Sequence, residues 1–273
     1  MIKLATVLCL ALIIGSVATA SAAEKITVTG STTVLPLAEA EAEAYNGQQT
    51  DCQITVTGGG TGAGITAAGE GRADIAMASR EIKDSERSKY SKNNFQQFFI
   101  GYDGICIVVS KSIYDAGVKA ITKEQLKNIY AGKIKNWKEL NGPDKDIYVV
   151  AREDGSGTRD TFNELVMGST TTETPGVSTV AQGNSEVKTA VTGSDKAIGY
   201  VGFSYAKGGD LGVLKYEDVM PAVENIKSGS YPLNRHLYFY TWGQPTPCAQ
   251  KFIDFVLSTP GQKIAEENGF IPL

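Results

Sequence analysis

The sequence predicts an α/β protein in which short strands alternate with helices. Seven apolar or alternating runs have the length and composition of strands; they lie at residues 26–29, 54–57, 75–78, 105–109, 147–150, 198–201 and 237–240. Segments of helical spacing lie between them, and this alternation is typical of α/β folds. At 273 residues, of which 42% are apolar, the chain is long enough to bury a substantial core.

The first 22 residues are predicted to be a secretory signal peptide. A basic start at residues 1–3 precedes an apolar run at 4–17 and small residues at 18–23. A retained membrane anchor is disfavoured because the apolar run is shorter than the roughly 20 residues that a span requires. Cys9 lies inside the run and not at a cleavage site, so we expect a cleaved, periplasmic protein and not a lipoprotein.

Three predicted strands end in turns that are rich in glycine and hydroxyl residues. A helix that starts after such a turn has unpaired N–H groups and the positive end of its dipole at its first residues, and both favour an anion. Hydroxyls add neutral donors, so three such turns suggest one shared anion site, although each alone is also explained as a helix cap. The candidate residues are Ser31, Thr32, Thr33, Thr61, Arg152, Ser156, Gly157 and Thr158.

Two further segments at strand ends add charged candidates. Ser79 and Arg80 follow the third predicted strand, at the carboxyl end where α/β sheets tend to bind ligands. Asp103 precedes an apolar strand and would be a hydrogen-bond acceptor among donors. Taken alone, Arg80 is also explained as a surface ion pair and Asp103 as a turn residue.

The remaining elements complete the α/β order. Residues 122–130 begin with a capping threonine and place their apolar side chains on one face, which predicts a helix. Two C-terminal helices are predicted at 250–257 and 261–268, and the Ser/Thr-rich segment 168–176 is predicted to be a loop or extended connector.

Two extended apolar stretches, at residues 100–109 and 231–240, are candidate crossings between two lobes. If both are hinges, the first lobe is built from both ends of the chain. The predicted division is residues 23–104 and 235–273 in lobe 1 and residues 105–234 in lobe 2. A ligand cleft then lies between the lobes, with the turns that follow the first strands on one wall and residues 152–158 on the other.

Composition and motifs exclude several function classes. A net charge of −4 without a basic block argues against nucleic acid. Gly58, Gly60 and Ala63 fit the dinucleotide fingerprint, but an exported protein seldom meets a nicotinamide cofactor, so this interpretation is disfavoured. The single histidine, His236, lies in an alternating strand and is interpreted as structural, which leaves no triad. We therefore expect no catalysis, cofactor or metal.

Three cysteines remain after the leader: Cys52, Cys106 and Cys248. An odd count in an exported protein permits one disulfide and one free thiol, or three buried thiols. Their spacing matches no metal motif, and Cys106 lies in an apolar strand where core packing is the simpler explanation.

Seven motifs, in order along the mature chain, resemble the periplasmic phosphate-binding proteins of Pst-type ABC importers. They lie at residues 30–36, 58–64, 78–81, 102–104, 152–159, 198–201 and 269–273. The motif at 152–158 is highly specific, whereas the glycine loop alone would not be. The resemblance implies a two-lobed periplasmic-binding fold of type II, a monomer that closes on phosphate and delivers it to a membrane permease.

The resemblance also assigns roles to the candidate residues. Ser31, Thr32, Thr33 and Thr61 would bind from one wall, Ser79 and Arg80 would add contacts, and Arg152, Ser156, Gly157 and Thr158 would form the opposite wall. Longer members have an aspartate directly after the serine where this chain has Arg80, so the acceptor role is assigned to Asp103, as in shorter members. The alternatives are a receptor for sulfate or molybdate and a secreted phosphatase-like hydrolase.

Overall fold

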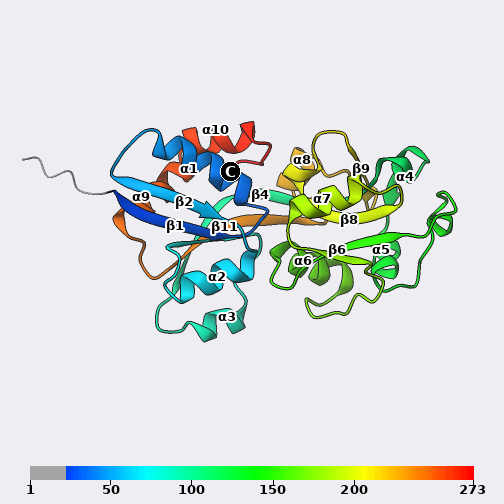
Figure 1. Cartoon of the computed structure of the whole chain (residues 1–273), viewed down its shortest axis with the longest axis horizontal. Coiled ribbons are helices and arrows are strands. Elements are labelled where there is room, and N and C mark those ends of the chain that lie inside the picture. The colour runs from blue at the N-terminus through cyan, green and yellow to red at the C-terminus, as the bar shows by residue number, and fades with distance from the viewer. Residues whose placement is uncertain (1–22) are drawn as a thin grey trace, which may run out of the picture.

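The structure is a computed structural model that describes residues 23–273; the predicted signal peptide at 1–22 lies outside the described residues. The molecule has two lobes that lie side by side, and two strands, β4 (Phe95–Ser110) and β11 (Asn234–Trp242), run through the junction between them (Figure 1). Strands and helices alternate through most of the chain, so the predicted α/β class is confirmed.

Lobe 1 contains three parallel strands at the start of the chain and helices from both ends of the chain. Its elements are β1 (Glu24–Gly30), β2 (Cys52–Thr57), β3 (Ile75–Ala78), α1 (Leu35–Asn46), α2 (Thr61–Gly69), α3 (Asp84–Lys89), α9 (Pro247–Leu257) and α10 (Thr259–Glu267). Helices α1, α9 and α10 pack together on one side of the sheet, and α2 and α3 lie on the other (Figure 1).

Lobe 2 is formed by the middle of the chain. Its helical elements are α4 (Lys111–Asp115), α5 (Lys123–Tyr130), η1 (Trp137–Leu140), α6 (Gly157–Phe162), the π-helix η2 (Asn163–Met167), α7 (Asn184–Thr192), η3 (Phe203–Ala206) and α8 (Val223–Lys227). Its strands are β5 (Ala120–Ile121), β6 (Tyr148–Arg152), β7 (Thr179–Ala181), β8 (Ala197–Gly202), β9 (Leu211–Val213) and β10 (Lys215–Tyr216).

One mixed sheet continues through both lobes in the order β2-β1-β3-β11-β4-β8-β6-β7, with β9 also paired to β4. Strands β2, β1 and β3 are parallel to one another, and so are β8, β6 and β7. Strand β11 pairs antiparallel with both β3 and β4. Because the carboxyl ends of parallel strands meet at one edge, the turns after β1, β2 and β3 lie together.

Strand β4 is long enough to belong to both lobes. Its first part pairs with β11 as far as Gly104, and from Ile105 onward it pairs with β8. The register between β4 and β11 shifts between Leu237 and Tyr238, and such a bulge bends and twists a strand pair. The lobes are thus joined by backbone that is hydrogen-bonded on both sides of the junction.

Each lobe has its own hydrophobic core. The main cluster of lobe 1 includes Ile26, Leu37, Phe239 and Phe252, whereas that of lobe 2 includes Ile107 and other residues between positions 105 and 233, joined by Ile271 from the C-terminus. Burial of apolar surface contributes about 25 cal/mol per Å² to stability. Because the two clusters consist of different residues, each one stabilises mainly its own lobe. No helix within residues 23–273 has the length and apolar character needed to cross a membrane.

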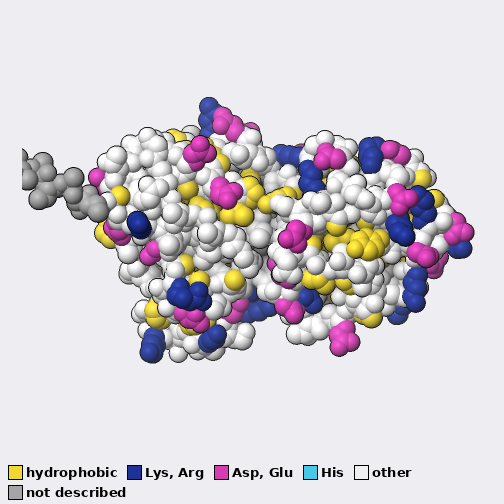
Figure 2. Space-filling view, in the orientation of Figure 1, with side chains coloured by type: hydrophobic (Ala, Val, Ile, Leu, Met, Phe, Trp, Pro, Cys, Tyr) yellow, Lys and Arg dark blue, Asp and Glu magenta, His cyan; other side chains and the backbone are white. Residues whose placement is uncertain are grey.

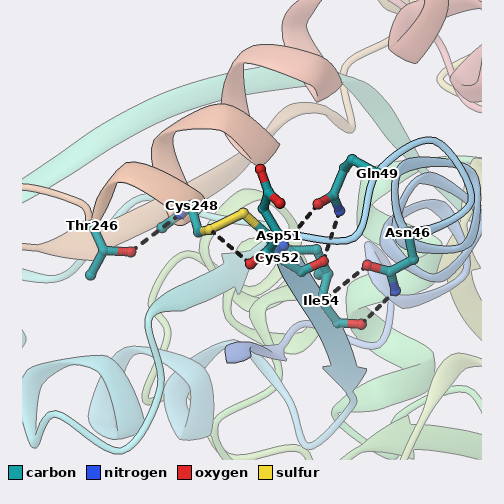
Figure 3. The surroundings of a disulfide bond; sticks show 8 residues. Asn46, Gln49, Asp51, Cys52, Ile54, Thr246 and Cys248 are labelled. Carbon is teal, nitrogen blue, oxygen red and sulfur yellow. Dashed lines mark hydrogen bonds between the residues drawn. A yellow bond between two sulfur atoms is a disulfide. The ribbon is translucent and has the colours of Figure 1, made fainter. Parts of the chain in front are cut away.

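A disulfide joins the start of β2 to the start of α9, between Cys52 and Cys248 (Figure 3). The Gln49 side chain donates to the carbonyl of Cys52 and accepts from its N–H, and Asn46 does the same for Ile54. Cys106 is a free, buried thiol. Of the two cysteine arrangements that the sequence permits, the structure therefore has one disulfide and one free thiol.

The predicted elements agree with the observed ones, with shifts at their ends. Helix α5 has the predicted threonine cap, since Thr122 Oγ1 accepts from the Gln125 N–H at 3.2 Å. Residues 168–176 contain no helix or strand. The predicted strand at 105–109 is the second part of the longer β4, because the preceding segment pairs with β11.

Candidate anion-binding site

Three turns of lobe 1 interlock at the carboxyl edge of β1, β2 and β3. Ser31 N–H donates to the Met77 carbonyl at 2.9 Å, and Gly60 N–H donates to the Gly30 carbonyl at 2.8 Å. A Cβ at Gly30 would lie 2.3 Å from the Met77 carbonyl oxygen, and its φ is +137°, so only glycine fits there. These bonds bring Ser31 and its neighbours next to Thr61 and Ser79.

The hydroxyls of these turns are buried and are bonded to one another. Ser79 N–H donates to Thr61 Oγ1 at 3.2 Å, and the two hydroxyl oxygens are 3.4 Å apart. Thr33 N–H donates to Ser31 Oγ at 3.2 Å. Each of these four side chains is at most 2% exposed. These four side chains therefore lie together at the carboxyl edge of β1, β2 and β3.

Lobe 2 contributes the end of β6 and the start of α6. Ser156 caps α6 by accepting from the Arg159 N–H at 3.2 Å. The N–H groups of Gly157 and Thr158 donate to no acceptor in the part of the chain that the structure describes. Such N–H groups at the start of a helix are suited to an anion.

The two walls are in contact across the lobe boundary. A Cβ at Gly157 would lie 2.4 Å from Thr61 Oγ1 and 2.6 Å from Ser79 Oγ, both in lobe 1. Thr33 Oγ1 is 3.0 Å from Thr158 Oγ1. Glycine at 157 is therefore required for the lobes to approach this closely.

Arg152 lies at the end of β6 and is 1% exposed. Its Nε and Nη2 donate to the Glu153 carboxylate at 2.8 Å each, and Nη2 also donates to Thr32 Oγ1 of lobe 1 at 3.0 Å. Its Nη1 is buried and has no partner among the described residues. An unpartnered, buried guanidinium nitrogen is costly unless it binds an acceptor, so Nη1 is available for an anion.

Asp103 lies on β4 at the junction of the lobes and is 1% exposed. Its Oδ1 accepts from the Phe203 N–H at 2.9 Å, and its Oδ2 accepts from Arg235 Nε at 2.8 Å. Arg235 therefore supplies the counter-charge that a buried carboxylate requires.

Arg235 and Asn184 are two site residues that the sequence prediction missed. Arg235 donates to Thr158 Oγ1 and Thr33 Oγ1, and Asn184 donates to Thr32 Oγ1 and Thr33 Oγ1. A signal for Arg235 was present, because it occupies an inward position of the alternating strand β11. Asn184, the first residue of α7, has no such signal, since asparagine is common near helix starts.

Arg80 is bonded to carboxylates and not to the hydroxyls of the turns. Its Nε donates to Asp160 of lobe 2, and its Nη1 and Nη2 donate to Glu86, all at 2.8 Å. Lys83 Nζ also lies 2.8 Å from Asp160. Of the predicted contact residues, Arg80 alone lines a neighbouring cleft of about 540 Å³ between the lobes.

Burial shifts the pKa values of several groups around the site. Burial raises the pKa of Tyr200, whose hydroxyl accepts from the Arg152 N–H at 3.2 Å. Burial lowers the pKa of Arg235, and the adjacent Asp103 carboxylate opposes that shift. Within residues 23–273 no group of three or more metal-ligating side chains is arranged to hold a metal ion.

His236 does not belong to the hydroxyl network. Its ring packs on Phe99, with centroids 4.5 Å apart, and on Tyr102, and its Nδ1 is 3.2 Å from the Tyr238 hydroxyl. Successive residues of a strand point to opposite faces, so His236 and Arg235 lie on different sides of β11. These contacts agree with the structural role inferred from the sequence.

Comparisons with known proteins agree with this geometry. The family model of the PBP superfamily domain matches residues 15–260. The phosphate-binding protein PstS of Bacillus subtilis is 33% identical over 253 residues, which cover 92% of this chain and 82% of that protein. PstS of Staphylococcus epidermidis is 34% identical over 259 residues, which cover 89% of this chain and 77% of that protein.

Two solved structures are similar over nearly the whole chain. A substrate-binding protein with bound phosphate from Clostridium perfringens is 37% identical, with a TM-score of 0.84 and coverage of 92% of this chain and 100% of that one. An ABC-type phosphate transport receptor from Vibrio cholerae is 34% identical, with a TM-score of 0.74 and coverage of 91% and 100%. This chain belongs to the PBP superfamily and, within it, to the family of PstS phosphate-binding proteins.

Proposed function

We propose that this protein binds inorganic phosphate and delivers it to the membrane permease of an ABC importer. The observation that carries the proposal is the buried set of donors from both lobes, with Arg152 Nη1 and the Gly157 and Thr158 N–H groups unpaired among the described residues. The buried carboxylate of Asp103 is joined to Thr158 through Arg235, which donates to both. A hydrogen bond to a charged group contributes about 1.5–3 kcal/mol, so several such donors can replace the water around a dianion.

The proposed contact set follows the sequence prediction with one reassignment. The phosphate contacts are Ser31, Thr32, Thr33, Thr61, Ser79, Asp103, Arg152, Ser156, Gly157 and Thr158. Arg80 was predicted as a contact, but its guanidinium is bonded to Asp160 and Glu86, and we assign it to an ion pair that holds the lobes together.

Phosphate binding is proposed to close the two lobes. Residues 23–104 and 235–273 would move as one body and residues 105–234 as the other, about the junction parts of β4 and β11. The separate hydrophobic cores support this division. A ligand that contacts both walls favours the closed state by the difference between its affinities for the two states.

The cellular context is proposed from the sequence and the relatives. We infer that the leader at residues 1–22 is cleaved and that the mature protein acts as a periplasmic monomer without a lipid anchor. On the face that Figure 2 shows, acidic and basic side chains are interspersed over both lobes, in keeping with the proposal that nucleic acid is not a partner.

A receptor without catalysis is the proposed class, and a phosphatase-like hydrolase is the alternative. The hydrolase would need an activated nucleophile or a metal cluster, and His236, the only histidine of the sequence, packs on aromatic rings. Incubation with a chromogenic phosphate ester tests this directly. Steady release of chromophore above that of a heat-denatured sample would support the hydrolase.

Calorimetric titration tests phosphate binding. The mature protein is stripped of carried-over ligand by unfolding and refolding and is then titrated with phosphate, sulfate and arsenate in separate runs. We expect saturable binding of phosphate and weak or absent binding of sulfate. Arg152→Lys keeps the positive charge but loses the planar guanidinium with its several donors, so it should weaken phosphate binding. The unfolding temperature of the variant should stay close to that of the wild type. Equal affinity for sulfate and phosphate would refute the proposal.

Asp103 is proposed to reject sulfate. Phosphate at neutral pH carries a proton with which it can donate a hydrogen bond to the carboxylate, whereas sulfate carries none and is repelled. In Asp103→Asn the amide can donate to sulfate, so sulfate should compete better with labelled phosphate than in the wild type. Equal, negligible competition in both proteins would remove Asp103 from this role.

A further inference from the structure

Two buried side chains outside the proposed contact set donate to its threonine hydroxyls. Asn184 at the start of α7 is 0% exposed, and Arg235 on β11 is 7% exposed. We propose that Asn184 and Arg235 fix the hydroxyls of Thr32 and Thr158 as donors that cannot accept, and thereby make the site selective for phosphate with a single proton. This inference rests on the proposed function and names the protonation state that the site prefers.

The orientation of the Asn184 amide is determined by its neighbours. The Gly202 N–H can only donate, and it lies 3.0 Å from the Asn184 Oδ1. The Nδ2 group therefore faces the threonines, and its two hydrogens point to Thr32 Oγ1 and Thr33 Oγ1, each 3.1 Å away. Both hydrogens of the amide are thus used.

Thr33 is the next member of the chain of bonds. A hydroxyl has one hydrogen and two lone pairs. Thr33 Oγ1 accepts from Asn184 Nδ2 and from Arg235 Nη2, the latter at 3.1 Å, so both lone pairs are occupied. Its own hydrogen must then donate, and Thr158 Oγ1 at 3.0 Å is the acceptor.

Thr158 and Thr32 are left with a hydrogen and no free lone pair. Thr158 Oγ1 accepts from Thr33 and from Arg235 Nη1 at 3.0 Å. Thr32 Oγ1 accepts from Asn184 Nδ2 and from Arg152 Nη2 at 3.0 Å. Each hydroxyl can therefore donate one further hydrogen bond but can accept none.

The same arrangement leaves a defined acceptor. Asp103 Oδ2 faces the Arg235 guanidinium, whereas Oδ1 accepts one bond, from the Phe203 N–H, and retains a second lone pair. Singly protonated phosphate has one hydrogen to donate, and that hydrogen matches Asp103 Oδ1. Doubly protonated phosphate has a second hydrogen, which cannot point to Thr32 or Thr158 because both lone pairs of each hydroxyl are occupied. The phosphate oxygens that these two hydroxyls contact must therefore carry no proton.

The other charged groups near these hydroxyls are paired. Arg152 of β6 is bonded to Glu153, Arg235 of β11 to Asp103 of β4, and Arg80 to Asp160 of α6. His236 follows Arg235 on β11 but packs on Phe99. The dependence of binding on pH is therefore expected to follow the second ionisation of phosphate itself.

The test compares phosphate affinity above and below that ionisation. In the wild type, acidification should weaken binding of total phosphate about tenfold or more, since a proton without an acceptor costs at least one hydrogen bond. Asn184→Leu removes the amide that donates to Thr32 and so frees a lone pair on that hydroxyl. Arg235→Lys removes the two guanidinium nitrogens that donate to Thr33 and Thr158. Both variants should bind about tenfold more weakly at alkaline pH but within about threefold of wild type at acidic pH.

Two measurements keep the outcomes separate. His236→Asn removes the only histidine and should retain the wild-type dependence on pH, and thermal unfolding checks that each variant folds; if Asn184→Leu does not fold, Arg235→Lys decides. Variants that lose the same factor at both pH values, or lose none, would overturn the assignment of hydroxyl polarity. A wild type that does not bind phosphate at either pH would instead refute the proposed function.

Discussion

Arg80 of lobe 1 and Asp160 of lobe 2 form an ion pair across the lobe boundary, with Nε 2.8 Å from Oδ2. Both side chains are largely buried, and Lys83 Nζ reaches the same carboxylate oxygen at 2.8 Å. Glu86, also in lobe 1, neutralises Arg80 from the other side. Opening of the lobes would have to break the contacts to Asp160 but not those to Glu86.

The first prediction concerns this ion pair. Asp160→Asn removes the charge of lobe 2 and leaves Arg80 paired with Glu86, so the closed state should lose stability and phosphate should dissociate faster. Loss of one partner of a buried pair is strongly destabilising, and we expect the dissociation constant to rise about tenfold or more. Asp154→Asn is the matched control, because Asp154 is 97% exposed and pairs with Arg159 inside lobe 2. Equal dissociation rates in both variants would contradict the prediction.

The second prediction concerns Gly157. A methyl group there would lie 2.4 Å from Thr61 Oγ1 and 2.6 Å from Ser79 Oγ, which belong to the other lobe. Gly157→Ala should therefore obstruct closure and weaken phosphate binding at least about a hundredfold, while each lobe stays folded. Small-angle scattering would show a radius of gyration that no longer decreases with phosphate. Gly47→Ala, where the nearest atom is 3.4 Å away, should behave as wild type.

The third prediction concerns a carboxyl group in the core of lobe 1. Glu41 on α1 is 0% exposed, neither of its oxygens has a partner among the described residues, and burial raises its pKa well above the usual value. Between the usual and the raised pKa the folded state binds more protons than the unfolded state, so stability should fall as the pH rises through this window.

Glu41→Gln removes that ionisation. The variant should be more stable than wild type by about 1–3 kcal/mol at neutral pH, and the difference should vanish below the usual pKa of glutamate. Urea denaturation across a pH series measures it. The control is Glu43→Gln, an exposed position on the same helix, which should leave the pH profile unchanged. A profile for Glu41→Gln that parallels wild type would contradict the prediction.

The fourth prediction concerns the disulfide. Cys52 and Cys248 are separated by 196 residues, so the bond restricts a long loop in the unfolded chain. Cys248→Ser should lower the free energy of unfolding by about 2–5 kcal/mol, and a reductant should lower that of wild type by a similar amount but leave the variant unaffected. A variant as stable as wild type would show that the bond contributes nothing.

Cys106 provides the control for that experiment. It is fully buried, and burial raises the pKa of its thiol well above the usual value, so the folded protein should not react with a thiol reagent. Cys106→Ala should remain as sensitive to reductant as wild type. Rapid labelling of Cys106 without denaturant would contradict its placement in the core.

The elements and the class of site could be predicted because their signals are local. An alternating run located β1 and apolar runs located β3 and β8, and the glycine and hydroxyl residues that follow β1 and β2 marked the donor turns. The capping threonine of α5 needed only its own helix to be recognised. Arg80 is the informative exception, since its position after β3 suggested a ligand contact and its carboxylate partners became visible only in the folded chain.

The sequence by itself determined the α/β order, the resemblance to phosphate-binding proteins and the donor-rich turns, because each depends on residues within a few positions of one another. Tertiary structure alone decided which residues meet across the lobes. Arg235 is 77 residues from Thr158 and 202 residues from Thr33, and Asn184 is 152 residues from Thr32. Contacts over such separations depend on how the two lobes pack around β4 and β11, and no local pattern encodes that packing.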